Sequence, residues 1–242
     1  DKFGENKSKV AVDAGSAPLW TVKRLEKAGA KIAETDDPCL ASRASKNKTE
    51  VEGAKAAHIR DGVALVKFMA WFAEAAPQGG VTEISAAEKL EEFRKEHPLY
   101  RGPSFSTIAG SGGNGAIVHY SSTPETNREV KPGELFLLDS GGQYPDGTTD
   151  VTRTFAVGKP GEEEARRYTQ VLKGMVDLTI TSFPEGTSGH QLDSIARAPL
   201  WAEGLDYNHG TGHGVGSYLT VHEGPQSISK GSRNNTALTS GM

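Results

Sequence analysis

The chain has 242 residues, 36% of them hydrophobic, and a formal net charge of −4. This composition is typical of a soluble globular protein, and its dispersed Lys and Arg residues form no basic patch that would favour a nucleic acid partner. No apolar run approaches the roughly 20 residues of a membrane span, and the single Cys39 cannot form an internal disulfide. We therefore expect a cytoplasmic protein that binds neither membranes nor nucleic acid.

Residues 1–45 are expected to be the last part of an α/β unit. An apolar run at Val10–Val12, a helical pattern from Trp20 to Leu25 and an apolar position at Ile32 predict strand, helix and strand. The polar and small residues that follow, CLASRASKNKTE, are typical of a link between domains.

Two helices are expected next. Thr49 and Glu52 form a capping-box pattern, which predicts the start of a long helix. Ser85 and Glu88 repeat the pattern at the start of a more polar, surface helix. The long helix carries an apolar seam made of Ala56, Ile59, Val63, Val66 and Ala70.

From Tyr100 the pattern changes to short β-like runs separated by Gly, Pro and Asn, which predict a sheet. Helical patterns return at 162–183 and 189–205, and more β-like sequence follows. The order of helix, helix, strands, helix, helix and strands favours an α+β fold over a parallel doubly wound one.

A pair of carboxylates marks the first candidate site. The apolar run Leu135–Leu138 predicts a buried strand that ends on Asp139, and the turn Pro145-Asp146-Gly147 returns a second strand with Asp150 roughly opposite. Two such carboxylates repel each other unless protons or cations neutralise them. One Asp alone would more often be solvated, and Asp146 is expected to be only a turn residue, but the pair favours a metal site.

The segment YNHGTGHGVGSYLTVHEGP holds the second candidate group. His209 and His213 have an i, i+4 spacing, but the glycines between and after them disfavour a helix and favour extended backbone. On such backbone His213 can bind a metal while His209 faces a substrate, and a returning strand would bring His222 to the same place. A single His is more often structural, but three beside two Asp residues favour a functional site.

A fourth imidazole, His119, ends the apolar run of GGNGAIVHY. The preceding GSGGNG matches the letters of a dinucleotide-binding loop, but β-like sequence follows it where that motif requires a helix. We expect a loop that lets substrate approach the backbone, and no nucleotide cofactor.

Carboxylate with imidazole suits Mn²⁺, Zn²⁺ or Co²⁺. A pair of such ions that shares carboxylates would catalyse metal-assisted hydrolysis, while neighbouring histidines hold the carbonyl oxygen or pass a proton to the leaving amine. The residues by themselves lead to this class of reaction and no further.

The segments GGNGAIVHY, LLDSGGQYPDGTTDVTRTF and HGTGHGVGSYLTVHEGP closely resemble the aminopeptidase P family of Xaa-Pro aminopeptidases, of the cytosolic eukaryotic type. This family belongs to the pita-bread metallopeptidase superfamily. The resemblance implies a pita-bread catalytic domain over 46–242, incomplete at its C-terminus. It also implies that 1–45 are the C-terminal fragment of a creatinase-like, non-catalytic domain.

The resemblance further implies a role for each candidate residue. The metal ligands would be Asp139, Asp150 and His213, which usually hold two Mn²⁺ ions. His119 and His222 would act on the scissile carbonyl and in proton transfer. His209, His119 and His222 would bind the substrate, a peptide with proline in the second position, whose first residue is released.

Two further Glu ligands of the family would lie beyond Met242, and the start at Asp1 also resembles a cut through a longer polypeptide. We therefore expect the longer parent protein to be the active enzyme and a homodimer, and this chain alone to be inactive, with its metal absent or partial. The alternative is a non-catalytic pita-bread module that binds peptides or proteins. Such relatives typically lose ligand residues, whereas the three ligand positions covered by this chain are intact.

Overall fold

A computed structural model describes residues 1–231 and 235–242 of the protein. The chain forms two compact units, Asp1–Arg43 and Ala44–Met242. Within the described residues, no helix combines the length and the apolar character needed to cross a membrane. The assignment of the first unit to a creatinase-like domain stays a prediction.

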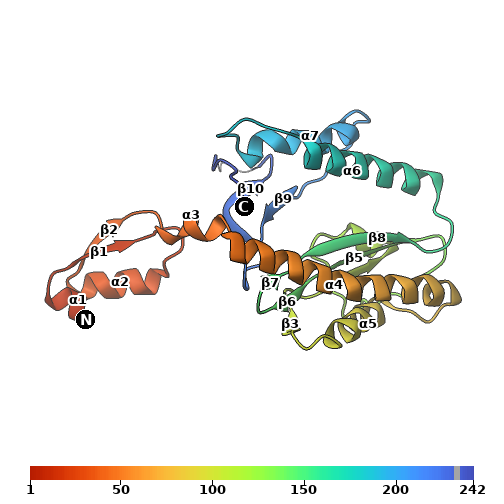
Figure 1. Ribbon diagram of the computed structural model, residues 1–242, viewed down its shortest axis with the longest axis horizontal. Coiled ribbons are helices and arrows are strands. Elements are labelled where there is room, and N and C mark those ends of the chain that lie inside the picture. Colours follow the sequence, from red (N-terminus) through yellow and green to blue (C-terminus); the bar gives the residue numbers. More distant parts are fainter. Residues whose placement is uncertain (232–234) are drawn as a thin grey trace. The chain divides into compact units, whose positions relative to one another are not determined.

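The first unit contains the predicted strand, helix and strand (Figure 1). Strands β1 (Lys9–Val12) and β2 (Lys31–Glu34) pair in parallel, and α2 (Leu19–Ala28) connects them. A parallel pair needs such a crossover connection, which explains the helical pattern between two short apolar runs. The short helices α1 (Lys2–Glu5) and α3 (Cys39–Ala44) lie before and after this βαβ element in the chain.

The second unit has the predicted order of helices, strands, helices and strands, so the α+β prediction is confirmed (Figure 1). Its sheets are small and antiparallel, with strand orders β4-β5-β8, β3-β6-β7 and β10-β9. The elements are α4 (Lys48–Ala75), η1 (Ala76–Gln78), α5 (Glu83–Lys95), β3 (Gly102–Pro103), β4 (Ile108–Ser111), η2 (Gly112–Ala116), β5 (Leu135–Ser140), β6 (Gly142–Tyr144), β7 (Gly147–Thr148), β8 (Val151–Ala156), α6 (Glu162–Ile180), α7 (Gly189–Trp201), β9 (Gly212–Gly214) and β10 (Glu223–Ile228).

Both predicted capping boxes were placed too late in the sequence. Asn47, not Thr49, caps α4, because its extended backbone lets its side chain accept a hydrogen bond from the Glu50 amide. Thr82 caps α5 in the same way, with Ser85 as its reciprocal partner.

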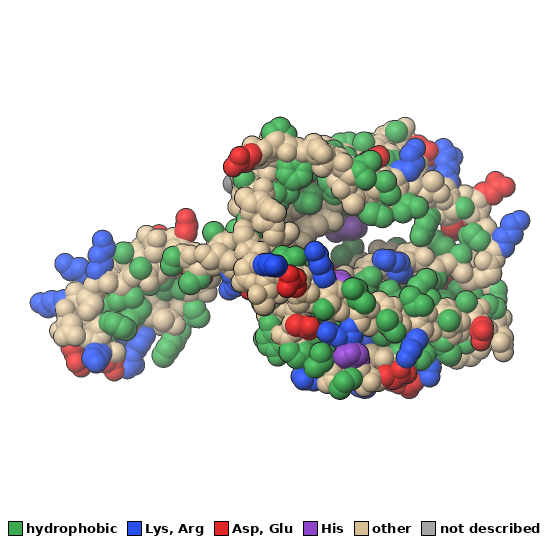
Figure 2. Space-filling model, viewed as in Figure 1, with side chains coloured by type: hydrophobic (Ala, Val, Ile, Leu, Met, Phe, Trp, Pro, Cys, Tyr) green, Lys and Arg blue, Asp and Glu red, His purple; other side chains and the backbone are tan. Residues whose placement is uncertain are grey.

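The apolar seam of α4 faces outward. Ile59, Val63 and Val66 are 73%, 55% and 64% exposed, and Figure 2 shows hydrophobic side chains interspersed with charged ones on the surface along α4. The opposite face is buried instead, and it carries Phe68 and Phe72. The aromatic rings offer more area to the core than the β-branched residues, and this decides which stripe of the helix is buried.

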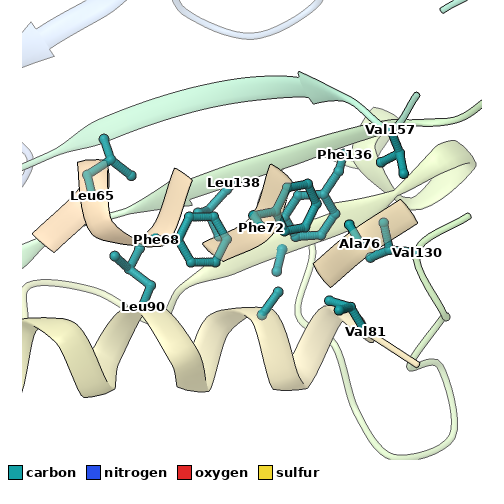
Figure 3. Packing of buried hydrophobic residues seen from close by; sticks show 12 residues of the cluster. Leu65, Phe68, Phe72, Ala76, Val81, Leu90, Val130, Phe136, Leu138 and Val157 are labelled. Atoms are coloured by element: carbon teal, nitrogen blue, oxygen red, sulfur yellow. The ribbon is translucent and has the colours of Figure 1, made fainter. Parts of the chain in front are cut away.

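The core lies between α4, α5 and β5 (Figure 3). Phe72 stacks on Phe136 of β5 with ring centroids 4.8 Å apart. Alternate residues of β5 point into this core, Phe136 and Leu138 among them. Because side chains alternate along a strand, Asp139 points to the opposite face.

A buried ion pair between α4 and α5 holds the C-terminal end of β5 through Ser140. Arg94 of α5 donates two hydrogen bonds to Asp61 of α4, at 2.8 and 2.9 Å, and a third to the hydroxyl of Ser140 at 3.1 Å. Tyr144 of β6 donates to the same Asp61 carboxylate at 2.8 Å. The backbone around Asp139 is therefore held by groups on two helices and a neighbouring strand.

Candidate metal centre

Asp139 and Asp150 meet at the end of the β5–β8 hairpin. In the antiparallel register Asp139 lies opposite Thr152, whereas Asp150 comes just before β8. Asp150, predicted to lie roughly opposite Asp139, is thus two residues before the residue directly opposite Asp139. Since side chains two residues apart share a face of a strand, Asp150 still lies on the face of Thr152 and Asp139.

Asp139 is the least satisfied carboxylate of the site. Its Oδ1 atom is buried, and no hydrogen-bond partner for it exists among the residues that the structure describes. Burial raises the pKa of Asp139 and the Asp150 charge raises it further, while a hydrogen bond with Thr152 and the imidazoles of His119 and His213 act in the opposite direction. A buried oxygen without a donor is a suitable ligand for a cation.

Three other side chains form a group that could hold a metal ion. One ligand atom from each of Asp150, His213 and His222 lies within 4.8 Å of the other two. The His213 Nε2 atom is 3.3 Å from Asp150 Oδ2, and the His213 and His222 ring centroids are 4.2 Å apart. The group includes His222, which the sequence did not assign to the metal, and it does not include Asp139.

The orientation of His213 is set by its backbone neighbour. Its Nδ1–H donates to the Gly214 carbonyl at 2.9 Å, which directs Nε2 towards Asp150. The Asp150 carboxylate raises the pKa of His213, and burial opposes that shift. His213 must lose this proton before Nε2 can bind a metal.

The strands β9 and β10 bring His222 back towards His213. They pair antiparallel, with Glu223 opposite Gly214, so His222 stands where the returning strand begins. Leu219, in the intervening turn, has a positive φ of 60°, and its amide donates to Gln143 of β6 at 3.2 Å. The turn is thereby joined to the sheet elements next to the carboxylates.

A buried carboxylate holds the loop that carries His119. Glu83 is fully buried at the start of α5. It accepts hydrogen bonds from the Ser111 amide, the Asn114 amide group, the Tyr120 hydroxyl and the Arg128 amide. His119, with a φ of 58°, lies next to Tyr120, and its ring centroid is 6.4 Å from that of His222.

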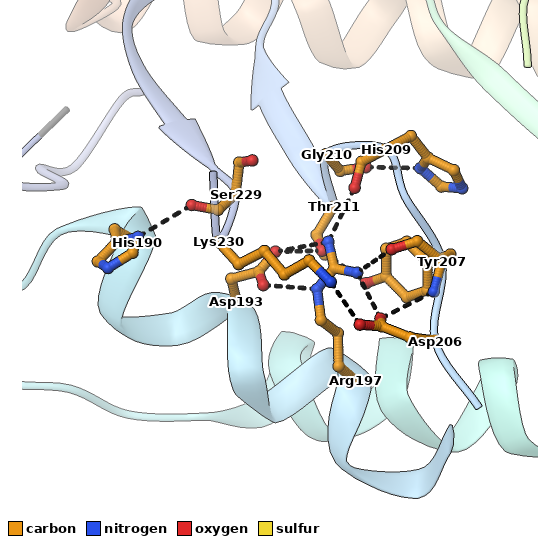
Figure 4. A network of polar contacts seen from close by, with 10 residues as sticks. All are labelled: His190, Asp193, Arg197, Asp206, Tyr207, His209, Gly210, Thr211, Ser229 and Lys230. Carbon is orange, nitrogen blue, oxygen red and sulfur yellow. Dashed lines mark hydrogen bonds and ion pairs between the residues drawn. The ribbon is translucent and has the colours of Figure 1, made fainter. Parts of the chain in front are cut away.

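Among the described residues, His209 is not part of the group of metal-binding candidates. Its Nδ1–H donates to the Gly210 carbonyl at 2.8 Å, and its ring centroid is 4.7 Å from the Tyr207 ring. A polar network around Arg197 of α7 holds the backbone of this segment (Figure 4).

The predicted residues therefore gather in the second unit. Contacts join His213 to Asp150 and to His222, and His222 to His119. Figure 2 shows a hollow in this unit with histidine side chains on its wall.

Comparison with known proteins identifies the family. Residues 52–242 match the sequence profile of Peptidase_M24, metallopeptidase family M24. The chain belongs to metallopeptidase family M24. It is 51% identical to a probable Xaa-Pro aminopeptidase P of Laccaria bicolor over 99% of its own length and 36% of that protein's length. It is 52% identical to a protein of the same name from Coprinopsis cinerea, over 83% of this chain and 32% of that protein.

Solved M24-type structures confirm the predicted pita-bread fold. An X-prolyl aminopeptidase of Caenorhabditis elegans, described as a cytosolic enzyme with a di-nuclear active site, matches with a TM-score of 0.80 and 31% identity, over 96% of this chain and 45% of that one. The prolidase of Pyrococcus furiosus matches with a TM-score of 0.83 and 27% identity, over 100% of this chain and 68% of that one. The chain thus spans about a third of the length of the curated relatives.

The sequence patterns did not indicate the buried charged residues that hold the histidine segments, among them Glu83 and Arg197. Glu83 stands in the first turn of α5, where an acidic residue looks like ordinary helix-dipole compensation. Arg197 had a detectable signal, because Asp193 precedes it by one helical turn. Such pairs are usually exposed, so the spacing does not indicate that this one is buried.

Proposed function

We propose that the full-length protein containing this chain is a metal-dependent aminopeptidase that releases the N-terminal residue from peptides with proline in the second position. The observation that carries the proposal is the Asp150, His213 and His222 group beside the buried Asp139. It occurs in a chain about half identical to proteins named probable Xaa-Pro aminopeptidase P.

Asp139, Asp150 and His213 are the proposed metal ligands. They fit a divalent cation because no described residue donates to the buried Asp139 Oδ1 and because imidazole and carboxylate atoms converge nearby. We propose two ions, Mn²⁺ first and Zn²⁺ or Co²⁺ as alternatives. Such ions, when bound, polarise a carbonyl group and lower the pKa of water.

The histidines would act on the substrate. His222 and His119, whose ring centroids are 6.4 Å apart, would hold the scissile carbonyl and pass a proton to the leaving proline nitrogen. As the Xaa-Pro bond breaks, that nitrogen must receive a proton, because it can leave as a neutral amine but not as an amide anion. His209 would line the pocket for the proline ring.

The resemblance to aminopeptidase P supports three broader proposals. The protein would act on a peptide substrate, and the full-length protein would be a homodimer. We place it in the cytoplasm, as the Caenorhabditis elegans relative is described as a cytosolic enzyme. The two further Glu ligands that the family implies are not assigned to any residue of this chain, so we propose that the 242-residue chain alone has no turnover.

The test is hydrolysis of an Xaa-Pro-Xaa peptide by the full-length protein with Mn²⁺, followed as release of the first amino acid. Asp139→Asn, Asp150→Asn and His213→Ala should each lower the rate more than about 100-fold, because loss of even an outer-shell partner of a metal costs 10–100-fold. Asp146→Asn is the matched control, since Asp146 lies in the same hairpin but pairs with Arg60 at 2.9 Å.

Retained activity in the three ligand variants would refute the proposed roles. A wild-type protein that binds the peptide with Mn²⁺ present but releases no amino acid would support the alternative, a non-catalytic module. The intact ligand positions argue against that alternative.

A further inference from the structure

Arg197 is a fully buried guanidinium whose donors are all in use (Figure 4). An Arg side chain has five N–H groups in a rigid planar fork. Two of them bind Asp193, through Nε at 2.6 Å and Nη2 at 3.3 Å, and one binds Asp206 at 2.7 Å. The remaining two reach the backbone carbonyls of Tyr207 and His209.

Those two carbonyls belong to a segment without regular secondary structure, between α7 and β9. Backbone groups in such a segment lack the partners that a helix or a sheet supplies. Arg197 supplies them from one rigid side chain, with His209 held at 2.8 Å. A segment that glycine would otherwise leave free to move is thus fixed to the end of α7.

The network also fixes side chains of the same segment. The Arg197 guanidinium lies 3.7 Å from the centroid of the Tyr207 ring, and the Tyr207 ring contacts that of His209 at 4.7 Å. Thr211 donates to Asp193 at 2.6 Å, so its oxygen must accept the 2.6 Å hydrogen bond from the Tyr207 hydroxyl. Thr211 leads directly into β9, which carries His213.

We infer that Arg197 is a positioning residue that sets the place of His209 through Tyr207 and the two bound carbonyls, and thereby the selectivity for proline in the second position. This inference rests on the proposed function, because His209 has a substrate only if that function holds. Arg197 itself has no route to the substrate, since it is buried and its donors are occupied.

A matched pair of arginines separates positioning from simple stability. Arg60 also binds an aspartate through two N–H groups, Asp146 at 2.9 Å each, and it also lies over a tyrosine ring, Tyr144 at 4.9 Å. Within the described part of the chain, however, Arg60 donates to no backbone carbonyl of residues 207–213. Lysine keeps the charge at either position and loses the planar fork.

The experiment compares Arg197→Lys, Tyr207→Leu and Arg60→Lys in the full-length protein with Mn²⁺. The measured quantity is the ratio of kcat/KM for an Xaa-Pro-Xaa peptide to that for the matching Xaa-Ala-Xaa peptide. We expect this ratio to fall at least about 10-fold in the first two variants, the scale on which pocket contacts discriminate substrates. Arg60→Lys should keep the wild-type ratio, because general destabilisation lowers the active fraction equally for both peptides.

Hydrogen exchange gives a second readout that needs no turnover. Arg197→Lys should speed amide exchange in the peptide covering 207–213, and Arg60→Lys should not. An unchanged selectivity ratio in both Arg197→Lys and Tyr207→Leu would overturn the inference, and so would unchanged exchange at 207–213 in Arg197→Lys. If Arg197→Lys does not fold, the ratio in Tyr207→Leu decides. If the wild type has no turnover, the proposed function fails and exchange alone decides whether Arg197 positions the segment.

Discussion

At the scale of single residues, the site keeps groups that a protein selected only for stability would avoid. Asp139 has a buried oxygen to which no residue in the described part of the chain donates, next to a second carboxylate. A buried polar group without a partner costs about 1–3 kcal/mol. Such costs are common where the group has a ligand or a reaction to serve.

Asp139→Asn should stabilise the metal-free protein because it removes a buried charge next to Asp150. The pKa of Asp139 is higher in the folded state than in the unfolded chain, where it is about 3.8. As pH rises above 3.8, the unfolded chain therefore loses this proton more readily, and the folded state loses stability relative to it. At pH 8 with a chelator, we expect a gain of roughly 1 kcal/mol in the free energy of unfolding. Urea unfolding measures it, and a loss of stability would contradict the argument. Asp146→Asn, which removes the partner of Arg60, should show no gain.

The Arg197 network should be visible in acid unfolding. Burial raises the pKa of Asp193, but hydrogen bonds from Arg197 and Thr211 outweigh it, so the pKa lies below the usual value of 3.8. A lowered carboxyl pKa contributes stability that is present above 3.8 and is lost as pH falls through the folded-state value.

Thr211→Val removes one of these donors, so acid unfolding followed by circular dichroism should begin at a higher pH. The control is Thr169→Val on α6, whose hydroxyl donates to the Ala165 carbonyl at 2.8 Å within the same helix. Equal acid midpoints in the two variants would show that Thr211 does not affect the pKa of Asp193.

At the scale of elements, α6 and α7 cross closely enough to exclude a side chain. A Cβ atom at Gly174 of α6 would stand 2.0 Å from the Ala196 carbonyl oxygen of α7. Ala196 directly precedes Arg197, so this contact also fixes the helix that carries the polar network. Gly62 of α4, in contrast, has no atom within 4 Å of such a Cβ.

Gly174→Ala and Gly62→Ala should thus have opposite signs. Overpacking at Gly174 should cost about 1–3 kcal/mol of unfolding free energy. Ala at Gly62 should add about 0.5–1 kcal/mol, because the helix interior gains a better helix former without a clash. Thermal unfolding of both variants gives the comparison, and a stabilised Gly174→Ala protein would contradict the close crossing.

At the scale of the whole second unit, the candidate ligands come from elements far apart in the chain. Asp139 and Asp150 belong to the β5–β8 hairpin, and His213 and His222 belong to the β9–β10 pair. An ion bound by both would join the two sheets, and it would bind the folded chain better than the unfolded one.

Mn²⁺ should therefore stabilise the full-length protein, by about 2.7 kcal/mol at 100 times its Kd. The pH dependence follows from His213. In the metal-free protein, protonated His213 forms an ion pair with Asp150, which raises its pKa. The stability from this ion pair is complete below pH 6.5 and is lost as pH rises through the folded-state pKa of His213. Metal binding requires His213 to release the same proton. The Mn²⁺-induced rise in Tm should thus grow with pH above 6.5, and it should vanish in Asp150→Asn. A rise that is the same at pH 6 and pH 8 would contradict this role of His213.

Local patterns were sufficient for the order of the elements, and the roles of the candidate residues stay predictions. The turn Pro145-Asp146-Gly147 and the apolar run before Asp139 predicted a hairpin, which the structure contains. Patterns failed where more than one residue could take the same role. The residues that cap α4 and α5 are Asn47 and Thr82, not Thr49 and Ser85, and Thr152 is the residue directly opposite Asp139. Backbone geometry outside the short motif decides both outcomes.

The sequence by itself determined the α+β class, the pair of Asp residues at a hairpin end and the glycine-rich histidine segment. These features depend on local periodicity and turn chemistry, which a few neighbouring residues specify. Only the tertiary structure decided which face of α4 is buried, that His222 and not Asp139 forms one group with Asp150 and His213 among the described residues, and that Arg197 holds the His209 backbone. Each of these depends on packing between segments distant in the chain, where burial selects one of several arrangements that local sequence allows equally.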